Sequence, residues 1–354
     1  MFLLLTSCAS LRSLPTNLEK VDVVEVRVEL ADPTGSCPGF SVPTTLVAVA
    51  SDGTEYSTHP DGQQKTAKLK HFQLVGAGVR VDPETGWVHI PANPARTFGA
   101  TGQLTVSTAY HTAQGSAAVP IRYDCAYTAD FAGTRGRDGT DGGGGINGDD
   151  GDAGGESQPG EPGQDGQDGS HGTHGGAGGD ADAVLVQVDT LDRPDAEGLV
   201  LVVVESQTTD HSVRFLVSQG GSVTVNARGG TGGRGGDGGS GGDGGDGGEG
   251  APDGDGGDGG DGGDGGNGAN GGAGGSVTVL LDPEVPFNPV QVENAGGAGG
   301  RAGAGGVGGS GGDTSSYGAP GRQGREGEAG SRKGSPGEDG PPTKPERQAL
   351  VLSL

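Results

Sequence analysis

Carboxylates recur at every third position of the stretch 229–275, where the commonest repeat is Gly-Gly-Asp. Asp243, Asp246, Asp258 and Asp261 share one phase of it. In a helix with three residues per turn, successive carboxylates lie about 9.3 Å apart. Calcium needs about six to eight oxygens at about 2.3–2.6 Å, so one segment cannot build a site, although two adjacent segments bring carboxylates together. The spacing predicts a solvated acidic ladder, with calcium binding at these four residues as a minor alternative.

Motifs for catalysis are by-products of the glycine content. Residues 238–242 (GGSGG) match the nucleophile elbow of hydrolases, but they neither follow a strand nor open a helix, as that mechanism requires. The histidines show no ligand or triad spacing; His171 and His174 lie one turn apart and cannot share a metal on one segment. We therefore expect no catalytic residue, no cofactor and no resident metal, and predict that the protein is not an enzyme.

Three cysteines offer a different chemistry. Leu5-Thr6-Ser7-Cys8 resembles a bacterial lipobox, in which the cysteine is lipidated and becomes the new amino terminus. The resemblance implies a signal over 1–8, lipidation at Cys8 and a tether over 9–19. It also implies a place in the cell envelope, lipid-anchored at the outer membrane or cell surface. The apolar run before the cysteine is short and lacks a basic residue, so we expect the signal to be truncated at its start.

Cys37 and Cys125 bracket a β-rich region. In an exported protein, a remaining even pair of cysteines predicts a disulfide. The bond would close a loop of roughly 90 residues, and the chain-entropy model gives it about 4 kcal/mol of stabilisation.

The distribution of glycine divides the chain into glycine-rich windows and regions of ordinary composition. The 354 residues include 81 glycines, and 68 of them lie in the windows 133–179, 229–275 and 296–340. Almost no apolar side chains lie in these windows, so they cannot build a side-chain core. The rest of the chain is long enough for one or two β domains with cores.

The β part begins at residue 20. Short runs of alternating apolar and polar residues predict strands over 21–30, 45–50, 72–81, 87–90, 104–110 and 118–127. The region 20–128 resembles a bacterial immunoglobulin-like sandwich, with Trp87 as an expected core anchor. Residues 199–204 (LVLVVV) are apolar on both faces and predict a buried central strand within 129–354.

The glycine windows have a period of three, and each breaks once. The breaks give arms at 133–154 and 160–178, 229–250 and 256–274, and 297–312 and 318–330; after Lys333 the frame slips by one residue. Ala251-Pro252-Asp253-Gly254, at the second break, is a strong turn signal. We interpret the windows as three hairpins with six arms, and expect the strands on either side of each hairpin to share one sheet.

A period of three is that of the polyproline II conformation, whose backbone groups must find partners outside their own helix. Gly-Gly-X is similar to the polyglycine II modules of snow-flea antifreeze protein and of the glycine-rich regions of PE-PGRS proteins. In these modules the helices lie side by side in a sheaf and hydrogen-bond laterally. Gly-Gly-X suits a helix with many neighbours in the sheaf, and Gly-X-X suits a helix with fewer. Segments such as Gly160-Glu161-Pro162-Gly163 instead resemble bacterial collagen-like repeats, and disorder is the third alternative.

These patterns predict an all-β fold with polyglycine II: an immunoglobulin-like sandwich followed by a β element that carries three glycine-rich hairpins. The net charge of −25 argues against nucleic acid as a partner. We expect a non-enzymatic cell-surface lipoprotein with a structural or adhesive role, attached to the membrane by its lipid and facing a surface or matrix ligand. A monomer is favoured. The alternative is a collagen-like trimeric stalk that binds a host or matrix ligand, and ice binding is a minor one.

Overall fold

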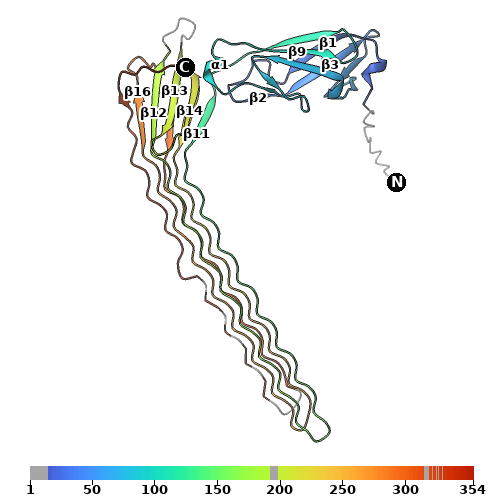
Figure 1. The fold of residues 1–354 in the computed structure, drawn as a ribbon, viewed down its shortest axis with the longest axis vertical. Coiled ribbons are helices and arrows are strands. Elements are labelled where there is room, and N and C mark those ends of the chain that lie inside the picture. The colour runs from blue at the N-terminus through green and yellow to red at the C-terminus, as the bar shows by residue number, and fades with distance from the viewer. Residues whose placement is uncertain are drawn as a thin grey trace, which may run out of the picture.

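A computed structural model describes residues 15–191, 198–314, 319–320, 322–323, 325, 327–328 and 330–354. Cys8 and most of the expected signal and tether therefore lie outside the described residues. The fold is mostly β-sheet with very little helix. It consists of a first β domain, a second β domain and a long rod of glycine-rich arms (Figure 1). No helix among the described residues has the length and apolarity to span a membrane.

The first β domain contains three small sheets around one core. Their strand orders are β1-β3-β4-β5, β10-β9-β6 and β2-β8-β7. The strands are β1 (Val23–Leu30), β2 (Ser41–Val42), β3 (Thr44–Ala50), β4 (Glu55–Ser57), β5 (Lys65–Thr66), β6 (Phe72–Ala77), β7 (Arg80–Val81), β8 (Val88–His89), β9 (Gly102–Thr108) and β10 (Gln114–Val119). Three single-turn helices complete the domain: η1 (Leu18–Lys20), η2 (Leu69–His71) and α1 (Pro94–Thr97).

The core of this domain is formed by the side chains that point inward at alternate positions of its strands. Leu46, Leu104 and Val106 are fully buried because they take the inward positions of β3 and β9. Trp87 is not a core anchor: its side chain is 44% exposed, since it directly precedes β8 and only Val88, on the strand, faces inward.

The expected strand over 118–127 is also wrong. Its first part belongs to β10, and its last part begins β11 (Ala126–Asp130), which lies in the second domain. Between them, Pro120 cannot donate a backbone hydrogen bond, and the chain passes from one domain to the other. The domain boundary therefore falls a few residues before 128.

The second β domain consists of two sheets that share one core. Parallel strands form the first, in the order β11-β15-β17, and the second has the order β14-β13-β12-β16-β18. Valines from both sheets, including Val186, Val202 and Val225, meet in a single buried cluster. The remaining strands are β12 (Val184–Thr190), β13 (Leu199–Ser206), β14 (Ser212–Ser218), β15 (Ser222–Asn226), β16 (Val277–Leu281), β17 (Val290–Glu293) and β18 (Glu346–Arg347).

The central strand β13 is buried on both faces, as its sequence predicts. Val200 to Val204 are all buried. One face of β13 lies in the core shared with the first sheet, whereas Leu201 and Val203 contact a smaller cluster that includes Phe98, Tyr123 and Leu352. The expectation of a buried strand at this place is confirmed.

The two sheets continue directly into the rod. Strands β11, β15 and β17 run out into arms 1 (133–154), 3 (229–250) and 5 (296–313), and arms 2 (160–179), 4 (254–275) and 6 (319–340) return to β12, β16 and β18. The strands on either side of one hairpin therefore lie in opposite sheets, not in one sheet as expected. The physical reason is that outgoing and returning arms stack as two layers, each of which extends one sheet.

Candidate functional site

The rod is the largest glycine-rich surface of the molecule, and its register is inherited from the sheets. Tyr127 pairs with Val223 across β11 and β15, and farther out the backbone N–H of Arg234 meets the side chain of Asp138; both pairs are 96 residues apart. Arms 2 and 4 keep a separation of 93 residues in the same way. The strand pairing therefore sets the register of the arms beyond the strands.

Backbone hydrogen bonds join the arms sideways at every third residue. Within the outgoing layer, Gly145 N–H donates to Ser240 O at 2.7 Å, and Gly241 N–H donates to Val307 O at 2.8 Å. Between the layers, Gly242 N–H donates to Gln167 O at 2.8 Å. The arms thus satisfy one another's amides without forming α-helices or β-strands.

The arms with the most and the fewest bonded neighbours differ in glycine content. Among the described residues, arms 3 and 4 each bond to four other arms, whereas arms 1 and 6 each bond to two. Arms 3 and 4 carry glycine at two of every three positions, and arms 1 and 6 carry it at one. Arms 2 and 5 each bond to three described arms although they carry mostly one and mostly two glycines per triplet, so the relation that the Gly-Gly-X and Gly-X-X patterns predict holds only for the other four arms.

Glycine is needed in the arms for space. None of the described arm glycines has a positive φ, so backbone conformation does not demand them. A Cβ atom at Gly241, in contrast, would come within 3.0 Å of the Gly260 carbonyl oxygen, and one at Gly242 within 3.0 Å of the Ile146 carbonyl oxygen. Both glycine columns of arm 3 therefore face neighbouring backbones.

Acidic residues of the rod accept backbone amides of neighbouring arms. Asp243 Oδ1 accepts the backbone N–H of Ser310 at 2.8 Å, and Asp246 Oδ1 accepts that of Asp313 at 2.8 Å. In the other layer, Asp258 and Asp261 accept the N–H groups of Arg322 and Arg325, each at 2.7 Å. In triplet 244–246 of arm 3, for example, two amides donate to carbonyl oxygens and the third, that of Asp246, donates to the side chain of Asp150.

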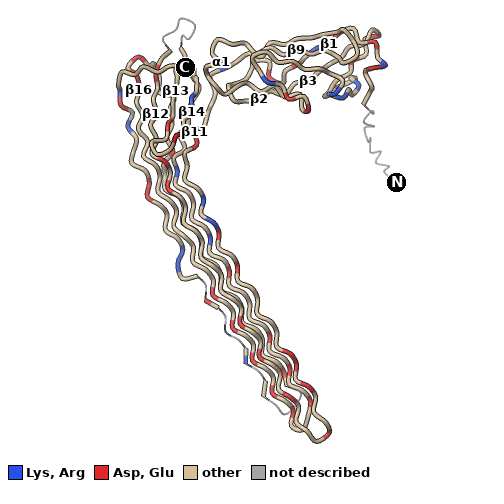
Figure 2. The backbone as a smooth tube through the Cα atoms, viewed as in Figure 1, with Lys and Arg blue, Asp and Glu red and all other residues tan. Residues whose placement is uncertain are grey.

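The ladder is consequently more than the solvated edge that the spacing predicts. Asp243, Asp246 and Asp258 are exposed and Asp261 is half-buried, and acidic residues recur along the whole rod (Figure 2). One oxygen of each of these carboxylates is nevertheless committed to a neighbouring backbone. The sequence signal for this role is the short acceptor at X: an aspartate or asparagine reaches the adjacent amide, and His171 and His174 do the same through Nδ1. Reasoning from periodicity alone missed it.

Hydrogen bonding to the backbone also lowers the pKa values of two further carboxyl groups of the rod, Asp138 and Asp237. The N–H of Arg234 holds the pKa of the Asp138 carboxyl below its ordinary value, with help from the Arg135 side chain. The N–H of Ala304 does the same to the pKa of Asp237, with help from Arg234. The charged carboxylate is therefore the form that the rod favours.

Within each of the two layers, the side-chain acceptors follow one direction from arm to arm, and the series ends at the last arm of the layer. Arms 1 and 2 supply them to arms 3 and 4, which supply them to arms 5 and 6. The matching positions of arm 5 are Ala298, Arg301, Ala304, Val307, Ser310 and Asp313. Since only the last is a carboxylate, the sequence itself marks arm 5 as an outer arm of its layer.

The frame slip after Lys333 is a one-residue bulge in arm 6. Glu328 bonds to Asp264 at a separation of 64 residues, and Arg332 bonds to Asn267 at 65. The bend between them, at Ser331, takes up the extra residue. The break expected at Ser315 lies outside the described residues.

The ladder does not gather into a metal centre in the described part of the chain. The only described group of three potential ligands is Cys37, Asp124 and Cys125, and its two sulfurs are bonded to each other. Asp243, Asp246, Asp258 and Asp261 lie singly along the rod. Calcium binding at these four residues therefore stays the minor alternative that the sequence predicts.

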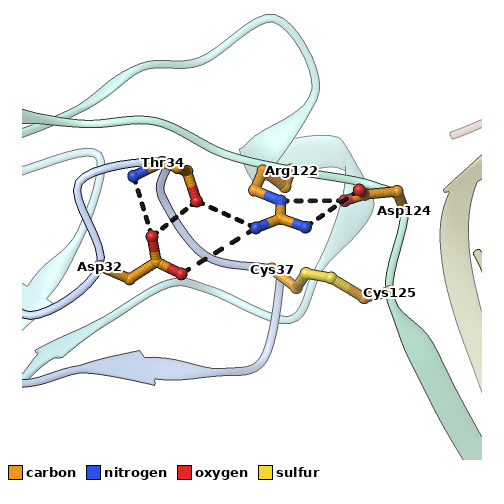
Figure 3. The surroundings of a disulfide bond; sticks show 6 residues. All are labelled: Asp32, Thr34, Cys37, Arg122, Asp124 and Cys125. Carbon is orange, nitrogen blue, oxygen red and sulfur yellow. Dashed lines mark hydrogen bonds and ion pairs between the residues drawn. A yellow bond between two sulfur atoms is a disulfide. The ribbon is translucent and has the colours of Figure 1, made fainter.

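A disulfide and an arginine fix the junction of the two β domains. Cys37 and Cys125 are bonded, with their Cα atoms 6.4 Å apart. Beside them, Arg122 donates to both oxygens of Asp124 and to the hydroxyl of Thr34, which itself bonds to Asp32 (Figure 3). The connecting segment is therefore held to the first domain immediately before β11 begins.

Comparison with protein-family models, curated proteins and solved structures finds no match to this chain.

Proposed function

We propose that the chain is a non-enzymatic, lipid-anchored protein of the cell surface with a structural role. An immunoglobulin-like domain near the membrane would carry a polyglycine II rod that acts as a rigid spacer. The lateral bonding of the rod is the observation that carries this proposal, because it turns an otherwise coreless sequence into a stiff element. Arm 1 has 22 residues, which at about 3.1 Å each extends about 65 Å.

The layout of the molecule supports the same function. The first described residues lie at the end of the first domain remote from the second domain, and the rod projects from the second domain (Figure 1). An anchor at Cys8 would therefore lie far from the rod. The disulfide and the Arg122 bonds at the junction would keep the angle between the two parts fixed.

The hydrogen bonds within the chain favour a monomer over a collagen-like trimer. A triple helix needs the glycine amides for bonds between three chains. In arms 3 and 4 those amides already donate to other arms of the same chain, as Gly241 does to Val307 and Gly260 does to Gly242. A second glycine per triplet has a use in a sheaf and none in a triple helix.

Two solution measurements test the proposal. Sedimentation equilibrium should give the mass of one chain, and small-angle X-ray scattering should give an elongated particle that includes a rod of about 65 Å. A mass of three chains would refute the monomeric sheaf and favour the collagen-like trimeric stalk. A monomer whose scattering is that of a flexible chain would refute the rigid spacer.

A further inference from the structure

Two histidines stand in a row of side-chain acceptors that otherwise consists of aspartates. His171 Nδ1 accepts the backbone N–H of Asp264 at 2.8 Å, and His174 Nδ1 accepts that of Asn267 at 2.9 Å. Both rings belong to arm 2, and both amides belong to arm 4. The other described acceptors that arm 2 offers to arm 4 in this row are carboxylates, at Asp165, Asp168 and Asp180.

An imidazole and a carboxylate lose their function as acceptors under different conditions. A ring nitrogen accepts a hydrogen bond only while it carries no proton, so both rings are neutral here and hold their proton on Nε2. A histidine side chain ordinarily takes up a second proton between about pH 8 and 5. An aspartate ordinarily stays charged down to about pH 4. Mild acid should therefore remove the acceptors of the Asp264 and Asn267 amides and leave those of the neighbouring triplets in place.

Both rings are exposed to solvent, so a proton can reach them. His171 Nδ1 lies 3.6 Å from Asp264 Oδ2, and protonation there exchanges the bond to the amide for an ion pair. His174 faces Asn267, which carries no charge, and loses its bond without that compensation. The charged residues at the level of the rings are Asp168 of arm 2, Arg137 and Asp141 of arm 1, Asp237 of arm 3, Asp261 and Asp264 of arm 4, and Glu328 and Arg332 of arm 6.

The loosening is local, because the carbonyl oxygens of the same two arm 4 residues keep their bonds. Gly172 N–H donates to Asp264 O at 2.8 Å, and Gly175 N–H donates to Asn267 O at 2.9 Å. These backbone groups do not titrate in this range of pH. Arms 2 and 4 thus remain joined, and the change is seen at two amides and not in the melting temperature.

We propose that His171 and His174 form a pH-sensitive joint in the rod. At neutral pH the two rings hold arm 2 to arm 4. In mild acid they release the amides of Asp264 and Asn267, and the rod becomes looser at that level. This inference rests on the sheaf of the proposed function and is independent of the lipid anchor.

Amide hydrogen exchange of the full-length chain, followed by NMR at about pH 7.5 and about pH 5.5, tests the joint. Protection is expressed relative to the unprotected rate at each pH. We expect the amides of Asp264 and Asn267 to lose about fivefold in protection in acid, which is the effect of one hydrogen bond. The amides of Asp258 and Asp261, which bond to carboxylates of the same row, should keep their protection and serve as internal controls.

Asparagine is the matched substitution, because it does not titrate and Asn147 Oδ1 already accepts an arm 3 amide at 2.9 Å. His174→Asn should keep the Asn267 amide protected at both pH values. In the same molecule the Asp264 amide, still bonded to His171, should respond to acid as in the wild type. His174→Phe offers no acceptor and should leave the Asn267 amide without this protection at both pH values.

The proposal is overturned if the wild-type amides of Asp264 and Asn267 are equally protected at both pH values. It is also overturned if His174→Asn loses protection at Asn267 in acid as the wild type does. Failure of the sheaf itself has a different signature, because the control amides of Asp258 and Asp261 would then exchange fast at both pH values. That result would overturn the proposed function together with the joint.

Discussion

Two adjacent glycines of arm 1 give the sharpest test of how the rod is held together. A Cβ at Gly145 would lie within 3.0 Å of the Gln167 carbonyl, whereas one at Gly144 would lie no closer than 3.4 Å to the Ser240 hydroxyl. Gly145→Ala must therefore push arm 1 away from arm 2. The bonds at stake are Gly145 N–H to Ser240 O, Gln167 N–H to Ile146 O and Gly242 N–H to Gln167 O.

Three bonds at about 1 kcal/mol each predict that Gly145→Ala destabilises the rod by about 3 kcal/mol. Gly144→Ala loses none of them. It restricts the unfolded chain and should stabilise the rod by about 0.4–1 kcal/mol. The two variants, identical in composition, should thus differ by about 3–4 kcal/mol.

Amide hydrogen exchange measures this difference where it arises, because the rod can open locally while the β domains stay folded. In Gly145→Ala the amides of Gln167 and Gly242 should lose protection, and in Gly144→Ala they should keep it. Equal protection in both variants would refute the packing argument. Fast exchange of both amides in the wild type would show that the rod is not formed.

Four further predictions follow from the acceptors and the cysteines. Asp243→Ala should lower protection of the Ser310 amide, and Asp243→Asn, which keeps an acceptor, should restore it; equal loss in both variants would assign the effect to charge. Because backbone bonds depress the pKa values of Asp138 and Asp237 below 3.8, their stabilisation is complete above that pH and is lost as the pH falls through the lower folded values. Melting temperatures should accordingly hold down to about pH 4 and fall below it, less steeply in Asp138→Asn; an unchanged slope would contradict this. Thiol titration of the exported, unreduced protein should find Cys37 and Cys125 unreactive, and free thiols at either would count against the bond. Cys8→Ala should move the protein from the membrane fraction to the soluble one, which a soluble wild type with its full start would rule out.

The rod could be predicted from the sequence to a large extent, because its geometry repeats. A column in which glycine recurs at every third residue leaves few packing choices, and the breaks at Ala251 and Pro252 place a hairpin end. The glycine columns of arm 3 follow from the period alone. The period does not show which arms pair with each other, since all arms share the same three-residue period. The pairing of strands such as β11 with β15 makes that choice.

The β domains and the cavity between them were harder to predict for a different reason. The β10 and β11 strands read as one alternating run, and only the tertiary separation of the domains divides them at Pro120. Trp87 has the size of a core residue, but the shortness of β8 leaves it outside. Phe40, Tyr127 and Phe215, which line a cavity where the two β domains meet, are far apart in the sequence, and no local pattern brings them together. That the aspartates accept backbone amides of neighbouring arms could not be predicted, because a charged side chain in a polar repeat is equally expected to contact water.

The inherited register restricts how the length of the rod can change. Adding three residues to one arm near the β domain would shift every bond beyond them by one triplet against each neighbouring arm. Insertions and deletions should therefore be tolerated only in multiples of three, in both arms of a hairpin together, and most readily at the far end. The single-residue bulge near Ser331 lies in arm 6, which has two bonded neighbours among the described residues. Natural variants of the rod should accordingly differ in length by multiples of three residues, with equal changes in both arms of a hairpin. Departures from this rule should be tolerated best in the outer arms.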